Sequence, residues 1–243
     1  MSTYVELCRL CAQEADLAGA STFVAVENLS DGDFADVSRW VRNSYVDIQN
    51  RNGGFWRWLS RPFTLQTVAS QGSYGYAAAD DITGVAPGVA GKIDRFNAWD
   101  LTNLVNPPSI YLTSTGVAGE RQLVWLPYDL YQRLFQFGAQ NAQSPVYISI
   151  DEQDQIVLGP VPNDIFTVRG RYWRGPQLLT LSGETPEMPA QYHDLIAYYA
   201  LKRYAFKNVA PEALSNAQDQ IRRYLIAMES KQLGEFTFAA ALQ

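Results

Sequence analysis

One helix near the C-terminal end constrains the fold more than any other part of the sequence. Residues 190–208 are predicted to form a helix that is apolar almost all round, because two apolar stripes recur at helical spacing. One stripe contains Tyr192, Leu195, Ile196, Tyr199 and Phe206, and the other contains Tyr198, Leu201, Tyr204 and Ala205. A helix with two apolar faces needs neighbours on both sides. The residue before it, Pro189, suits a first helical turn, where its missing N–H would have no partner.

The next segment predicts a second helix that begins at Pro211 and has one apolar stripe. That stripe consists of Leu214, Ala217, Ile221, Tyr224, Leu225 and Met228. Because residues 207–210 form a short join, the two helices are expected to be antiparallel neighbours. The resulting hairpin leaves one apolar face to be covered by other helices.

Two amphipathic helices near the N-terminal end have the faces that this hairpin lacks. The first is predicted over Thr3–Leu17, and the second begins at the polar run 30–33, whose short side chains can accept N–H groups of a first turn. We therefore expect an antiparallel helical bundle of two N-terminal and two C-terminal helices, formed by residues 1–54 and 186–233.

Residues 55–185 have the pattern of strands and turns and are expected to form a β-rich insertion. The strand candidates are Phe63–Ala69, Ile93–Trp99, Ile110–Ser114, Leu123–Leu126, Val146–Ile150, Gln155–Leu158 and Phe166–Trp173. The polar turn 151–154 predicts a hairpin, residues 127–137 predict one short helix, and the Gly- and Ala-rich residues 72–91 predict a loop. The fold class is therefore α+β.

Composition excludes several classes of protein. The chain has 243 residues, 47% of them hydrophobic and 18% charged, which is typical of a globular protein rather than a disordered one. The net charge of −6 argues against a general nucleic-acid binder. We expect no membrane partner, since no apolar run is long enough to span a bilayer and no signal-peptide pattern begins the sequence. This composition is typical of a cytosolic protein without cofactors.

Three motifs resemble chemical sites but lack the partners that chemistry requires. Cys8 and Cys11 have CxxC spacing on one helix, without further ligands for a metal, and are expected to pack as small apolar side chains. Residues 86–93 resemble a phosphate-binding loop, but Ile93 replaces the required Ser or Thr. His193 is the only histidine and has no nucleophile beside it. We therefore predict no catalytic residue, no metal and no cofactor.

Carbohydrate chemistry remains an alternative. Asp80–Asp81 and Asp151–Asp154 could supply the paired carboxylates of a glycosidase, although acidic residues in predicted turns are usually solvated. A carbohydrate-binding module would instead use exposed tryptophans such as Trp99 or Trp125.

An aromatic and basic segment follows the second helix. Trp56, Arg57, Trp58 and Arg61 interleave aromatic rings with arginines, as surfaces that bind single-stranded nucleic acid do. In this acidic chain, we favour a hydrophobic plug where the bundle meets the insertion, with arginines at its rim.

The last residues, 234–243, form a distinct apolar segment. Phe236, Phe238 and Leu242 could fold back on the bundle or act as an extended docking tail for a partner. Burial of one Phe is worth only about 1.5–3 kcal/mol, so docking would gain strength from many tails on one ring.

Several segments, taken in order, resemble the head–tail connector (adaptor) proteins of tailed bacteriophages. They are Trp40–Gln49, Trp56–Leu59, Tyr128–Arg133, Leu158–Asn163, Tyr172–Leu178 and Pro186–Ile196. The similarity extends over nearly all of residues 1–233 and depends on joint order and spacing rather than on one motif. The loop 72–91 is longer than the usual pattern, and the segment after residue 233 has no match in it.

The resemblance implies a structural virion protein that is not an enzyme and is made in the host cytoplasm. Such a protein would form a homo-oligomeric ring, a dodecamer, beneath the portal protein in the phage neck, between capsid and tail. The ring would extend the DNA channel, pass DNA without sequence-specific binding and dock tail or nozzle proteins. A tail-completion protein of the neck is the alternative within the same class.

Overall fold

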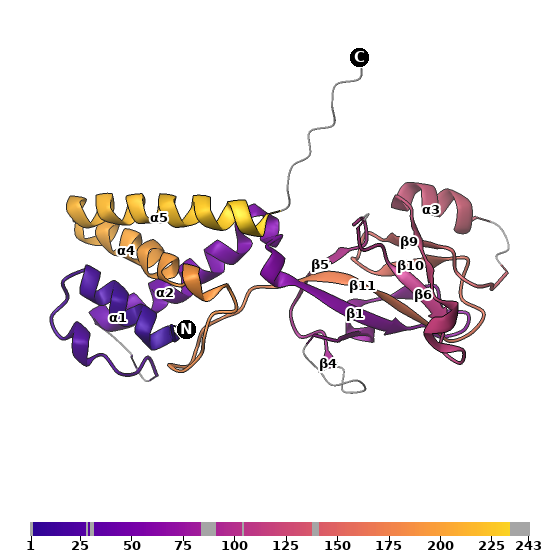
Figure 1. Cartoon of the computed structure of the whole chain (residues 1–243), viewed down its shortest axis with the longest axis horizontal. Coiled ribbons are helices and arrows are strands. Elements are labelled where there is room, and N and C mark those ends of the chain that lie inside the picture. Colours follow the sequence, from indigo (N-terminus) through magenta and orange to yellow (C-terminus); the bar gives the residue numbers. More distant parts are fainter. Residues whose placement is uncertain are drawn as a thin grey trace, which may run out of the picture. The chain divides into compact units, whose positions relative to one another are not determined.

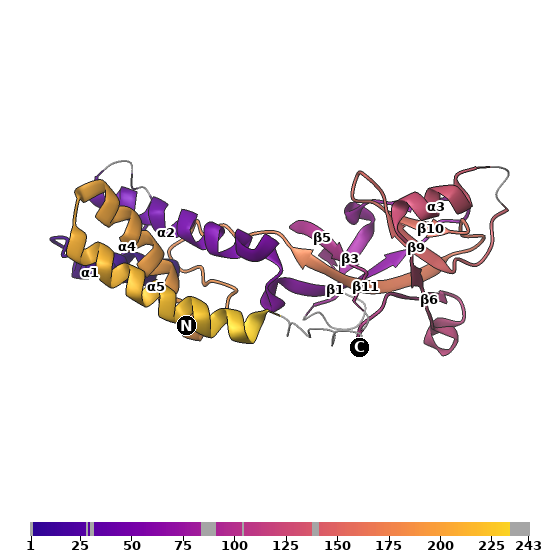
Figure 2. The ribbon, with the colours of Figure 1, turned by 90° about the horizontal axis from the view of Figure 1, so that it is seen from above.

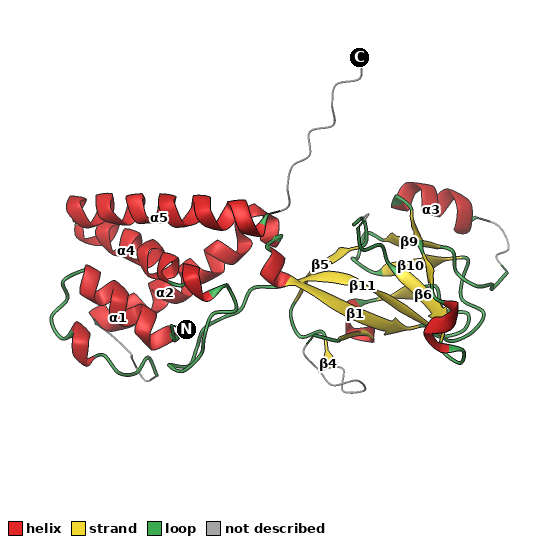
Figure 3. Ribbon diagram, in the orientation of Figure 1, coloured by secondary structure: helices red, strands yellow, loops and turns green. Residues whose placement is uncertain are grey.

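The computed structural model describes residues 2–27, 29, 32–83, 91–103, 105–137 and 141–233. The chain divides into two compact units, which we call the helical unit (residues 1–58 and 176–243) and the β unit (residues 59–175) (Figure 1). Figure 3 shows that every described strand lies in the β unit. The predicted α+β class is confirmed.

The helical unit contains four α-helices contributed by both ends of the sequence. They are α1 (Tyr4–Glu14), α2 (Asp33–Asn50), α4 (Asp194–Asn208) and α5 (Pro211–Gln232). The α4 helix packs against the other three and lies between α2 and α5 (Figure 2). Leu195, Ile196 and Leu201 are buried, as a helix with several apolar faces requires, whereas Phe206 near its end is exposed.

The helix ends differ in detail from their predicted positions. Thr3 and Glu6 form a reciprocal capping box at the start of α1, which ends at Glu14 rather than at residue 17. Gly32, with φ of 98°, directly precedes α2, and residues 30–31 of the predicted polar start lie outside the described residues. At α4, a short 3-10 helix over residues 190–192 replaces the first predicted turn.

A buried amide joins α2 to the segment that leads into α4. The Gln49 side chain accepts a hydrogen bond from the Gln177 N–H at 2.8 Å and donates one to the Gln177 carbonyl at 3.0 Å. The Tyr45 hydroxyl bonds the Gln177 side chain at 3.0 Å and accepts from the Glu187 N–H at 2.9 Å. Because each contact spans more than 100 residues of sequence, these bonds hold the returning chain against α2.

The larger sheet of the β unit has seven strands in the order β4-β3-β1-β11-β6-β7, and β5 also pairs with β11. Their bounds are β1 (Ser60–Gln66), β3 (Ala79–Asp81), β4 (Gly91–Lys92), β5 (Phe96–Asp100), β6 (Ser109–Leu112), β7 (Arg121–Gln122) and β11 (Phe166–Arg174). All pairings in this sheet are antiparallel. The long β11 strand is central, with β1 on one side and β6 and β5 in succession on the other.

The smaller sheet has four strands in the order β2-β10-β9-β8. Their bounds are β2 (Ser73–Tyr74), β8 (Val124–Trp125), β9 (Tyr147–Ile150) and β10 (Ile156–Gly159). The predicted hairpin is confirmed, since β9 and β10 pair across the turn 151–154. The helix α3 (Tyr128–Phe135) packs on this sheet, where the Tyr131 hydroxyl donates to the Leu158 carbonyl at 3.1 Å.

One apolar core joins the two sheets. Phe63, Leu65, Val168 and Tyr172 come from the larger sheet and pack with Ile148, Ile156 and Leu158 from the smaller one. This arrangement explains the alternating pattern of β1 and β11, because each buries one face and presents the other outward.

The predicted loop over residues 72–91 is wrong in part, since it contains β2 and β3. β2 has two residues and β3 has three, so neither is long enough to show an alternating apolar pattern. A 3-10 helix over Ala20–Thr22 follows α1. The other 3-10 helices are Arg51–Gly54, Arg57–Leu59, Tyr76–Ala78 and Gly116–Gly119.

Candidate interaction surfaces

The structure places Trp56 inside the helical unit. Its ring is fully buried, its indole N–H donates to the Ile48 carbonyl at 2.9 Å, and it stacks on Trp58 with ring centroids 4.8 Å apart. A ring held in this way cannot stack on a nucleic-acid base. Arg57 is exposed beside it, and Arg61 lies partly exposed at the start of β1 in the β unit.

The predicted tail residues Phe236, Phe238 and Leu242 lie outside the described residues, as do residues 86–90 of the loop that resembles a phosphate-binding motif. Their predicted roles stay predictions.

The acidic pairs make local structural contacts. Asp80 forms an ion pair with Lys92 at 2.7 Å, and Asp81 accepts a hydrogen bond from the Tyr172 hydroxyl at 2.7 Å. Burial opposes ionisation of Asp81, but the bonds from Tyr172 and Thr83 hold its pKa below the usual value. Burial and the neighbouring Asp81 carboxylate raise the pKa of Tyr172. This is a stabilised carboxylate, whereas a general acid would need a raised pKa.

The prediction that Trp99 is exposed is wrong. It is only 7% exposed, because it lies on the core side of β5 against Phe63 and Phe96. Its indole N–H donates to the Asp154 carbonyl at 2.8 Å. Trp125 is partly buried and packs against the same core. These positions do not form the exposed aromatic surface that sugar binding needs.

Cys8 and Cys11 pack as expected, and His193 is held by hydrogen bonds to the backbone. Both cysteines are fully buried on α1, and burial raises the pKa of each thiol, to about 12 for Cys11. His193 precedes α4 and is held between the Ser2 N–H at 3.2 Å and the Met188 carbonyl at 3.0 Å. Within the part of the chain that the structure describes, no group of three or more His, Cys, Asp or Glu residues could hold a metal.

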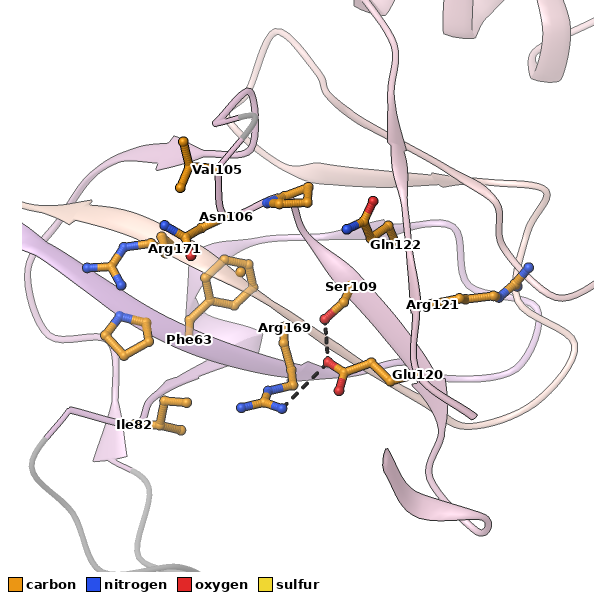
Figure 4. Close-up of a pocket in the computed structure, with 13 residues that line it drawn as sticks. Phe63, Ile82, Val105, Asn106, Ser109, Glu120, Arg121, Gln122, Arg169 and Arg171 are labelled. Atoms are coloured by element: carbon orange, nitrogen blue, oxygen red, sulfur yellow. Dashed lines mark hydrogen bonds and ion pairs between the residues drawn. The ribbon is translucent and has the colours of Figure 1, made fainter. Parts of the chain in front are cut away.

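A groove on the outer face of the larger sheet was not foreseen from the sequence. It has a volume of about 470 Å³ and is drawn in Figure 4. Its lining residues are Pro62, Phe63, Ile82, Val105, Asn106, Pro107, Ser109, Glu120, Arg121, Gln122, Arg169, Gly170 and Arg171. The groove therefore brings together strands β1, β11, β6 and β7 and the segment that precedes β6.

Strand register explains why polar side chains gather there. Arg169 pairs with Thr64 of β1 on one side and with Ser109 of β6 on the other, and Ser109 pairs with Gln122 of β7. Side chains directly opposite in a ladder share a face. Because Val168 next to Arg169 points into the core, this polar row lies on the outer face.

The groove is cationic at its centre. Arg169 lies 3.5 Å from the Glu120 carboxylate, which also accepts a hydrogen bond from the Ser109 hydroxyl at 2.5 Å (Figure 4). The Arg171 guanidinium donates to the Ser60 hydroxyl at 2.9 Å. Arg121 is directed away and donates to the Ser144 hydroxyl and the Pro145 carbonyl. The sequence held one signal for this groove: Arg169 and Arg171 are two residues apart on one predicted strand, so their side chains share a face.

A family model described as SU10 adaptor protein matches residues 2–240. The chain belongs to this family. The resemblance to phage adaptor proteins is thereby confirmed, and the chain is a bacteriophage structural protein of the adaptor class. An adaptor of this family interacts with other proteins of the phage head or tail. No curated protein matches the chain.

None of the described helices combines the length and the apolar character that a membrane span requires.

Proposed function

We propose that the chain is a head-to-tail adaptor that forms a ring, most simply a dodecamer, between the portal and the tail. The family match over residues 2–240 carries this proposal, because it covers both units rather than one isolated motif. The ring sits in the neck of the virion and extends the DNA channel. The α-helices that come from both ends of the sequence provide one packed body, and the β unit provides a second.

The charge of the chain suits passage of DNA without retention. Non-specific DNA binding is driven mostly by the counterions that are released when Lys and Arg neutralise phosphates. A chain with a net charge of −6 neutralises few phosphates and therefore binds DNA weakly. DNA thus passes through the ring without sequence-specific contacts. Tight, salt-sensitive binding of the isolated chain to duplex DNA would contradict this part of the proposal.

The segment after α5 is proposed as a docking tail. Phe236, Phe238 and Leu242 are its large apolar residues, and α5 ends at Gln232, so removal of residues 234–243 leaves every described helix whole. One tail adds the burial of a few apolar side chains, and a ring multiplies that contribution through effective concentration.

The experiment is co-sedimentation of the full chain, and of a 1–233 truncation, with the portal ring encoded by the same genome. Binding of the full chain that is weakened by truncation supports both the adaptor role and the docking tail. Retained binding of the truncation supports the adaptor role and contradicts the tail contact. The double variant F236A/F238A should match the truncation, and the matched control T237A should bind as the full chain does. If neither form binds the ring, the portal-docking proposal fails, and a tail-completion role is the next to test.

A further inference from the structure

The groove on the outer face of the larger sheet has the charge to bind an acidic occupant. Arg169 and Arg171 contribute two positive charges to it, and Glu120 only partly offsets them. Guanidinium groups bind carboxylates through paired hydrogen bonds, which gives them geometric preference as well as attraction. The exposed Val105 side chain and the neighbouring Pro107 add an apolar wall. Such a lining suits a short protein segment with carboxylates.

The β9–β10 turn of the same unit has the complementary properties. Residues 151–154 contain three carboxylates, and Glu152 and Asp154 are exposed. Among the described residues, no ion pair involves either of these two carboxylates. The turn therefore presents uncompensated negative charge on a narrow projection between two paired strands.

The turn is also held in a fixed conformation. The Asp151 carboxylate accepts hydrogen bonds from the Gln153 N–H at 2.9 Å and the Gln155 N–H at 2.8 Å. The Asp154 carbonyl accepts from the Trp99 indole at 2.8 Å, which anchors the turn to β5. A pre-organised segment loses little conformational entropy when it docks.

The groove and the turn cannot meet within one copy. The turn belongs to the smaller sheet, which packs on the inner face of the larger sheet, whereas the groove lies on the outer face. We propose that the groove of one copy binds the 151–154 turn of a second copy. This contact joins two different surfaces, so it is heterologous and generates a closed ring or an open chain of copies. The choice of a closed ring over an open chain rests on the adaptor function proposed above.

Duplex DNA is a weaker candidate for the same groove. The groove holds two arginines beside Glu120, so it could neutralise few of the phosphates that a duplex presents along its length. A carboxylate turn of the same chain offers both the charge and the shape.

The first test is disulfide cross-linking of the full chain carrying Q122C and Q153C, one in the groove and one in the turn. Both native cysteines are buried, so the new thiols are the accessible ones. The doubly substituted chain, oxidised both alone at high concentration and with the portal ring, should give a ladder of covalent multimers. Each single variant should give no covalent multimers, because a heterologous contact places different positions together.

Three results separate the outcomes. Dimers from Q122C alone would overturn the proposal in favour of a groove-to-groove contact. Intact portal assembly without any ladder would overturn the proposal and leave the adaptor function standing. Absence of both portal assembly and ladder would count against both.

The second test is charge reversal with rescue. R169E and E152R should each weaken self-association by about tenfold or more, and the R169E/E152R double variant should recover most of it, because the pair is restored with opposite polarity. The matched control R133E changes an exposed arginine outside the groove and should have no effect. Thermal unfolding of each variant shows that the fold is retained. Loss of duplex DNA binding in R169E, without any change in self-association, would assign the groove to DNA and overturn the proposal.

Discussion

The helical unit and the β unit use their charged side chains differently. In the helical unit, ion pairs join helices that are distant in sequence: Arg51 with Glu229, Asp47 with Arg203, and Asp36 with Lys207. In the β unit, Arg169 and Arg171 line an open sheet face, where Arg169 contacts Glu120 and Arg171 donates to Ser60 of β1. The ion pairs of the helical unit thus join its helices to one another, whereas the two arginines of the β unit line a surface groove, which is proposed above to bind a second copy.

The largest expected effect on the helical unit comes from Trp56→Ala. Removal of this buried ring leaves a large cavity and takes one of two donors from the Ile48 carbonyl, which keeps its bond from the Arg51 N–H, and it should lower the free energy of unfolding by about 3–5 kcal/mol. Urea unfolding followed by circular dichroism measures the change. Arg57→Ala, at the exposed neighbour, is the control and should change little. Equal effects of the two substitutions would show that the ring is not a packing element.

Gly170→Ala tests the packing of the β unit. An added Cβ would lie 2.8 Å from the Phe63 ring, so the variant should lose about 1–3 kcal/mol of stability through overpacking. Gly75→Ala meets nothing within 4 Å and is the matched control. A smaller ring in the double variant G170A/F63L should recover part of the loss. No loss in G170A would mean that β1 and β11 are less closely packed than described.

Gln49→Ala tests the buried amide of the helical unit. The substitution leaves the N–H and carbonyl of Gln177 without their partner, which should cost about 1–3 kcal/mol. Gln13→Ala, at an exposed position of α1, should be neutral. Faster amide exchange near residue 177 in the Gln49 variant alone would locate the effect, and equal exchange in both variants would contradict it.

The smallest expected effect is the pH dependence contributed by Glu27. Hydrogen bonds from the hydroxyl and the N–H of Ser182 lower the pKa of its carboxyl to about 2. Since the folded pKa lies below the ordinary value of 4.5, the carboxylate stabilises the fold above about pH 4.5, and this contribution is lost as the pH falls towards 2. The unsubstituted chain should therefore be more stable than the Glu27→Gln variant above about pH 4.5, and the difference should shrink as the pH falls towards 2. A constant difference from pH 6 to pH 2 would contradict the assignment.

The sequence predicted long elements better than short ones. The apolar faces of α4 and the apolar stripe of α5 can be read from their own residues. The same holds for the alternation of β11 and for the acidic turn that joins β9 to β10. Short edge strands such as β2 and β4 have two residues each, so pairing with a neighbour defines them rather than their own pattern.

The candidate surfaces were less predictable for a related reason. The groove depends on register, because Arg169 meets Ser109 and Glu120 only after β6 and β11 pair. The prediction that Trp99 is exposed was wrong for the same reason, since the pairing of β5 with β11 directs its ring to the core. A single sequence gives the face of each strand but not the partner of each residue.

The most direct test of the proposed ring is the mass of the complex formed with the portal, measured by native mass spectrometry. The account predicts one complex in which the portal ring carries a fixed number of copies of the 27.2 kDa chain, twelve if the ring is dodecameric. A mixture in which the chain stays at 27.2 kDa beside the free portal ring would contradict it.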